Sequence, residues 1–155
     1  MTHPIYIKLR EQIDQYSVGF PKAASGVDLK ILKKLYTEEE AELFLDLSMQ
    51  LESPDSVSNR TNRDLKKTTD MLEAMAQNGL VFRKRKKNAV YYAAIPFVIG
   101  SFEFQLKRMD KEFAQMVDDY FTEVMFKNMG ETIPPLRTIP VNHSIDAAQK
   151  VAPYS

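Results

Sequence analysis

The sequence predicts a mainly helical domain with a small β-hairpin, arranged as a winged helix-turn-helix with additional N-terminal and C-terminal helices and an extended C-terminal tail. A segment with apolar residues at helical spacing covers 63–78 and ends at Asn78-Gly79. Two short apolar runs follow, at 80–82 and 89–94, and the cations of 83–87 separate them. A winged helix has this order of elements: a helix, a glycine that ends it, a strand, a charged turn and a second strand.

The amino-acid composition and charge indicate which classes of protein this chain can belong to. The 155 residues are 44% hydrophobic and 27% charged, which is typical of a globular chain. We expect a winged-helix domain with flanking helices over 1–130 and a tail or linker over 131–155. The 21 Lys+Arg balance 21 Asp+Glu, so any site for a polyanion must be a local patch. No stretch is long and apolar enough for a membrane span or a signal peptide, which predicts a cytoplasmic protein.

The N-terminal part predicts three helices. The first covers residues 5–16, and "SVGFPKAASG" ends it with glycine and proline. The second lies in 27–35, where apolar residues share one face. A third begins at Glu38, because Thr37 followed three residues later by Glu40 is a capping box.

The next two helices are expected to form the helix-turn-helix. In "ESPDSVSNRTN", Pro54 is placed to start the first of them. The second, over 63–78, is the expected recognition helix, with Asn62 as its N-cap. Its buried stripe is predicted to hold Leu65, Thr68 or Thr69, Leu72, Met75 and Ala76.

The expected wing is a hairpin whose strand residues alternate between two faces. Arg83 and Arg85 then share a face with Val81, and Leu80 and Phe82 take the other. Lys86-Lys87-Asn88 is expected to make the turn, with Asn88 at a positive φ.

Two further helices are expected between Phe97 and Gly130, divided near Met109-Asp110 with Asp110 as the cap. Their apolar residues would pack in the core or against a second copy, so a homodimer is expected. The candidate dimer face consists of Phe113, Met116, Phe121 and Val124. The tail over 131–155 contains four prolines and is expected to be an extended arm.

A cluster of cations gives a candidate contact surface for nucleic acid or for a protein partner. Nine positive charges lie between residues 60 and 87, and three acidic residues there, Asp64, Asp70 and Glu73, leave an excess of six. The cations could contact duplex DNA from helix 63–78 and wing 83–87. Alternatively, the lysine-rich turn only keeps the hairpin edge soluble. The nine cations are Arg60, Arg63, Lys66, Lys67, Arg83, Lys84, Arg85, Lys86 and Lys87.

The sequence lacks the patterns of the common catalytic and metal sites. It contains no cysteine, which excludes a disulfide, a cysteine-ligated zinc and a thiolate-held iron–sulfur cluster within this chain. It has no glycine-rich phosphate loop and no HExxH pattern. The acidic run Glu38-Glu39-Glu40 is explained by its place in a first helical turn. We therefore expect neither an enzyme nor a metal or cofactor site.

Several segments in order resemble one family. They are "SGVDLKILKKLYTEEEAELFLDL", "LEAMAQNGLVFRK", "YYAAIPFVIGSFEFQ", "LRTIPVNHSI" and "VAPYS". The chain resembles the N-terminal winged-helix region of bacterial and archaeal 4Fe-4S ferredoxin-type proteins. The resemblance covers roughly Tyr6 to Tyr154, and "PFVIGSFEFQ" and the proline-containing tail are its most specific parts.

The resemblance implies a non-catalytic interaction module that positions an electron-carrying part against a redox partner protein. In the family, the cysteines that hold the 4Fe-4S clusters would lie beyond the position of Ser155. This chain has none, so no cluster ligand and no catalytic residue can be assigned to it. The alternative is a winged-helix transcriptional regulator that binds duplex DNA.

Overall fold

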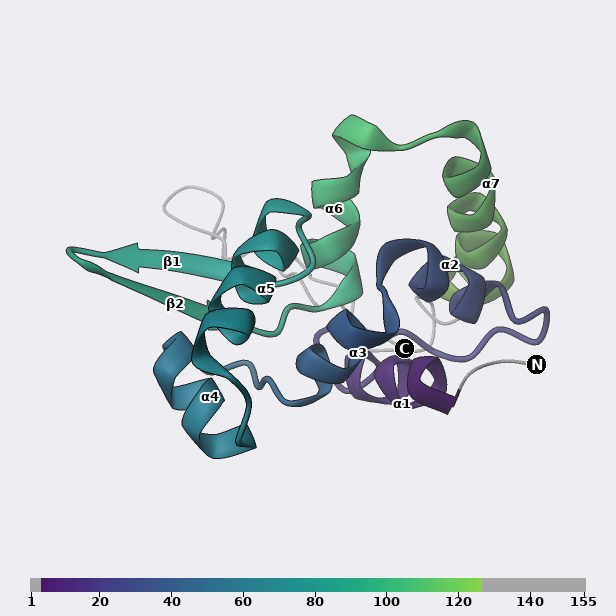
Figure 1. The fold of residues 1–155 in the computed structure, drawn as a ribbon. Helices are drawn as coiled ribbons and strands as arrows, with labels where there is room; N and C mark the ends of the chain where they lie inside the picture. Colours follow the sequence, from purple (N-terminus) through teal and green to yellow (C-terminus); the bar gives the residue numbers. More distant parts are fainter. Residues whose placement is uncertain (1–3, 127–155) are drawn as a thin grey trace, which may run out of the picture.

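The computed structural model describes residues 4–126, so the tail expected over 131–155 lies outside the described residues. The described part is mainly helical and carries one two-stranded antiparallel sheet (Figure 1). The helices and strands are α1 Pro4–Ile13, α2 Val27–Leu35, α3 Glu38–Leu45, α4 Pro54–Thr61, α5 Leu65–Gln77, β1 Phe82–Lys86, β2 Ala89–Ala93, α6 Phe102–Gln105, the 3-10 turn η2 Leu106–Arg108, α7 Lys111–Tyr120 and its π-helical continuation η3 Phe121–Met125.

Helix α1 packs against α2 and α3 and buries Tyr6, Leu9 and Ile13. After α1 the chain turns at Gly19, whose φ is 82°, and a Cβ there would lie 2.9 Å from the Asp14 carboxylate. Glycine is therefore the residue that this turn accommodates. The expected capping box at the start of α3 is confirmed.

Helices α4 and α5 lie where the sequence placed them, but the boundary between them differs. Asn62 ends α4 with a φ of 55°, and Asp64 caps α5 by accepting a hydrogen bond from the Lys67 backbone N–H. The expected N-cap at Asn62 is therefore wrong, because asparagine tolerates the left-handed conformation that separates the two helices. Leu65, expected in the buried stripe, is 44% exposed at the first position of α5.

Strands β1 and β2 form a hairpin that extends away from the helices (Figure 1). The backbone of Glu52 adds a short bridge to β2 through two hydrogen bonds with Tyr92, of 2.9 and 2.8 Å. Lys87 and Asn88 lie between the two strands, and Lys87 has a φ of 48°. The positive φ expected at Asn88 is therefore found at Lys87 instead.

The helix expected to begin near Phe97 does not form there. In the segment Phe97–Ser101, named η1, Ile99 has a φ of 58° and Gly100 is extended. The Glu103 carboxylate accepts the backbone N–H groups of Ile99 and Gly100 at 2.8 and 2.7 Å, which holds this non-helical backbone. The expected division before α7 is confirmed, because Asp110 caps α7 through the Phe113 N–H.

The C-terminal helices close the core. Helix α7 packs against α2 and buries Phe113, Val117 and Tyr120. The Tyr120 ring lies 4.6 Å from the Phe20 ring between centroids, and its hydroxyl donates to the Pro21 carbonyl at 3.0 Å. The long loop after α1 is thereby fixed beneath α7. Among the helices of residues 4–126, none has the length and apolar character that a bilayer crossing requires.

Candidate interaction surface

Glu73 in the middle of α5 connects the hairpin to the helix. Its carboxylate forms an ion pair with Arg83 and accepts a hydrogen bond of 2.8 Å from the Tyr92 hydroxyl. A guanidinium nitrogen of Arg85 lies 3.8 Å from the same carboxylate. The Tyr92 hydrogen bond lowers the pKa of Glu73 below its ordinary value, and burial raises the pKa of Tyr92 to about 12. Glu73 is therefore ionised at neutral pH and holds the hairpin against α5.

Two of the predicted contact arginines, Arg60 and Arg63, have partners within the chain. Arg60 donates to both Glu52 carboxylate oxygens, at 3.1 and 3.0 Å, and to the Asp46 carbonyl at 2.6 Å. Arg63 donates twice to one oxygen of the Asp46 carboxylate, at 2.9 and 2.7 Å. These arginines fasten α4 and the start of α5 to the end of α3.

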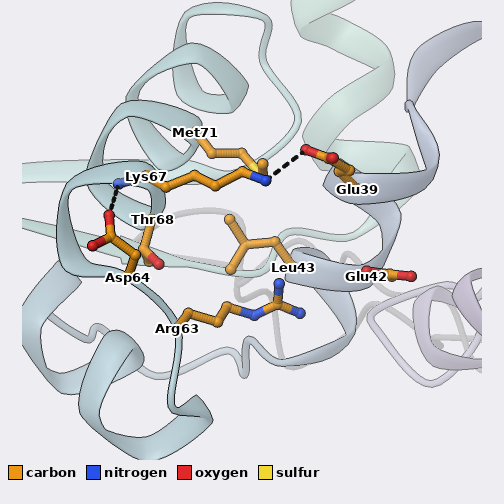
Figure 2. A pocket seen from close by; sticks show the side chains of 8 residues that line it. All are labelled: Glu39, Glu42, Leu43, Arg63, Asp64, Lys67, Thr68 and Met71. Atoms are coloured by element: carbon orange, nitrogen blue, oxygen red, sulfur yellow. Dashed lines mark hydrogen bonds and ion pairs between the residues drawn. The ribbon is translucent and has the colours of Figure 1, made fainter.

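A groove of about 200 Å³ lies between α3 and the first turns of α5 (Figure 2). Figure 2 shows Lys67 reaching across it toward Glu39, and the two charged atoms are 3.3 Å apart. Three acidic and two basic residues line the groove, so its charge is not that of a phosphate site. The lining residues are Glu39, Glu42, Leu43, Arg63, Asp64, Lys67, Thr68 and Met71.

The nine predicted cations divide into two groups. Arg60, Arg63, Lys67, Arg83 and Arg85 lie within 4 Å of a carboxylate of the chain. The other four are exposed and form no ion pair with another residue in 4–126; they are Lys66, Lys84, Lys86 and Lys87. Within the described residues, the second group therefore has no carboxylate that competes with a ligand for its charge.

The candidate dimer residues also divide. Phe113 and Val124 are only 3% and 7% exposed, because the chain's own core covers them, so they have almost no surface to offer a second copy. Met116 and Phe121 keep partial exposure. The expected homodimer stays a prediction, with its face reduced to these two residues among the four.

An open apolar groove of about 310 Å³ adjoins Phe121. The ring centroid of Phe121 lies 5.5 Å from that of Phe102 and 5.8 Å from that of Phe126. Phe126 is 63% exposed. Sequence reasoning missed the exposure of Phe126, because helical spacing alone does not say which side of a helix the core covers.

Sequence reasoning also missed the carboxylates that neutralise the arginines. In the sequence, Glu73 enters only as one of three acidic residues that reduce the local positive charge, and nothing singles out Asp46 or Glu52. A signal was present for Glu73, since strand alternation places Arg83 and Arg85 on one face, which the preceding helix can cover. No such local signal exists for Asp46, which lies 17 residues before Arg63.

Within 4–126 there is no group of three or more His, Cys, Asp or Glu side chains that could hold a metal ion.

Comparisons with protein-family models, curated proteins and solved structures found no significant match.

Proposed function

We propose that the chain is a non-catalytic winged-helix module that binds another protein. The order of α3, the Glu52 bridge, α4, α5 and the β1–β2 hairpin supports a winged helix. In that assignment α5 corresponds to the recognition helix and the hairpin to the wing. Because fold alone does not determine function, the choice of ligand depends on the surface chemistry.

The observation that carries the proposal is the partial neutralisation of the basic surface by four carboxylates of the chain. Five of the nine cations are ion-paired, including every arginine of the set. DNA binding gains most of its affinity from cations that are available to phosphates. The exposed side of α5 also carries Asp70, which would repel a phosphate backbone. A protein surface, with charges of both signs, fits this helix better.

The resemblance to ferredoxin-type proteins extends the proposal to electron transfer. The module would position a part that carries 4Fe-4S clusters against a redox partner. The coding sequence downstream of Ser155 tests this extension. Cysteines in a CxxCxxC spacing would support it, and their absence would remove the electron-transfer role while leaving the protein-binding role.

The second candidate is a regulator that binds duplex DNA. The observation in its favour is a group of exposed lysines that form no ion pair within residues 4–126, Lys66 on α5 and Lys84, Lys86 and Lys87 on the hairpin. A basic wing can contact a minor groove next to the recognition helix.

Site-specific photo-crosslinking in the native host distinguishes the candidates. Benzoylphenylalanine is placed at Phe126 or at Phe82, both exposed aromatic positions, and at Ile7 on α1 as a control. We expect discrete, protease-sensitive adducts from Phe126 or Phe82 and none from Ile7. Adducts that nuclease removes, with no protein adduct at either phenylalanine, would replace the proposal with the DNA-binding candidate.

A further inference from the structure

The four strand cations of the hairpin lie on two faces with different chemistry. The strand register pairs Arg83 with Tyr92 and Arg85 with Val90, on the face that Glu73 contacts. The register places Lys84 and Lys86 on the opposite face, where Lys84 lies across from Tyr91. The arginines therefore contact α5, and Lys84 and Lys86 point away from it.

The outer face of the hairpin comprises Phe82, Lys84, Lys86 and Tyr91, with Lys87 in the adjoining turn. All three lysines are exposed, and within residues 4–126 none of them forms an ion pair. The Lys86 ammonium lies 5.7 Å from the centroid of the Tyr91 ring. This face thus combines concentrated positive charge with two aromatic side chains, although the whole chain has no net charge.

We propose that the outer face of the hairpin docks an acidic segment of a protein partner. The inference rests on the proposed protein-binding function and specifies the partner's chemistry. Lysine ammonium groups attract carboxylates without the fixed geometry that a bidentate arginine imposes, so a flexible acidic segment satisfies them. Phe82 is 44% exposed and offers apolar contact beside the charges.

An acidic segment fits the surroundings of the hairpin better than a duplex does. A duplex bound by a winged helix contacts the recognition helix together with the wing. Here the helix carries exposed Asp64 and Asp70. A narrow acidic peptide can contact the hairpin alone and avoid both carboxylates.

The test is an NMR titration of the ¹⁵N-labelled full chain with a hexaglutamate peptide and, separately, with a short duplex DNA. We expect hexaglutamate to shift the backbone amides of Lys84, Lys86, Lys87 and Tyr91. The triple variant Lys84→Gln/Lys86→Gln/Lys87→Gln should bind roughly tenfold more weakly, because three exposed charge contacts are lost. The matched control is Lys8→Gln/Lys22→Gln/Lys30→Gln, which removes the same charge from exposed lysines elsewhere and should bind as the wild type does.

Three outcomes would overturn the inference. They are an absence of hexaglutamate binding, an equal loss of affinity in both triple variants, and tighter binding of the duplex than of hexaglutamate at physiological salt. The last outcome would assign the hairpin to nucleic acid. A failure here is separable from a failure of the proposed function, because a protein adduct from benzoylphenylalanine at Phe126 does not depend on the hairpin lysines.

Discussion

The inner and outer faces of the β1–β2 hairpin carry charge of the same sign, yet their cations have different surroundings. On the inner face, Arg83 and Arg85 lie against the Glu73 carboxylate and are about 30% and 69% exposed at the side chain. On the outer face, Lys84 and Lys86 have no carboxylate partner in the described residues. The comparison shows that a run of like charges in sequence does not measure the charge available to a ligand.

The largest expected effect on stability comes from removing the Glu73 carboxylate, which the inner face of the hairpin contacts. Glu73→Ala should lower the free energy of unfolding by about 1–3 kcal/mol, because the Tyr92 hydroxyl and the Arg83 guanidinium lose their shared partner. Urea denaturation measures this loss. Asp70→Ala is the control, since Asp70 is an exposed carboxylate on the same helix, and it should stay within about 0.5 kcal/mol of wild type. Equal effects of the two variants would mean that Glu73 does not anchor the hairpin.

Lowering the pH should remove the contribution that the Glu73 carboxylate makes to the free energy of unfolding. The pKa of Glu73 is lowered in the folded state, so its contribution to stability is present above the unfolded pKa and is lost as pH falls through the folded pKa. The stability difference between wild type and Glu73→Gln should therefore shrink between about pH 6 and pH 3. A difference that stays constant over this range would contradict the ionic role of Glu73.

The pKa of Asp28 is shifted in the opposite direction to that of Glu73, and substitution of Asp28 is expected to change the free energy of unfolding by less. Its carboxylate is fully buried, no donor within residues 4–126 meets hydrogen-bond geometry with either oxygen, and Arg10 Nε lies 3.7 Å away. Burial raises the pKa of Asp28. Stability from its neutral form is full below the unfolded pKa and is lost as pH rises through the folded pKa.

We therefore expect Asp28→Asn to be more stable than wild type at neutral pH by roughly 1 kcal/mol, and to lose that advantage in acid. Urea denaturation at the two pH values provides the measurement. A variant that is clearly less stable than wild type at neutral pH would show that the Arg10 contact outweighs the desolvation of the carboxylate.

The smallest effect on stability is expected from the outer face. Lys84→Gln/Lys86→Gln/Lys87→Gln should leave the free energy of unfolding within about 0.5 kcal/mol of wild type, because these exposed side chains form no ion pair with any residue in 4–126. Thermal unfolding monitored by circular dichroism measures the stability of the triple variant relative to wild type. A loss of unfolding free energy comparable to that of Glu73→Ala would show that the cations of both faces contribute to stability, which contradicts the account.

The features that sequence predicted correctly depend on neighbouring residues. Thr37 with Glu40, and Asp110 before α7, cap helices through contacts a few residues away. The shared face of Arg83 and Arg85 likewise follows from alternation within one strand. These features need no knowledge of the tertiary structure.

The features that sequence missed depend on contacts between distant or competing groups. Ile99 is a β-branched residue that rarely adopts a positive φ, and here the Glu103 carboxylate holds its backbone N–H. Asn62 and Asp64 are both suitable caps, and the left-handed turn at Asn62 decides between them. The ion pair of Arg63 with Asp46 requires the end of α3 and the turn before α5 to be brought together first.

We propose that the basic surface, in which five of the nine cations are ion-paired, does not bind nucleic acid. The most direct test of this proposal is the affinity of the full chain for a short duplex DNA across a series of salt concentrations. Fluorescence anisotropy of labelled duplex measures it for the wild type and for Lys84→Gln/Lys86→Gln/Lys87→Gln. We expect no binding by either protein at physiological salt, and only weak binding of the wild type at low salt. Tight, salt-dependent binding of the wild type at physiological salt, lost in the triple variant, would contradict the claim.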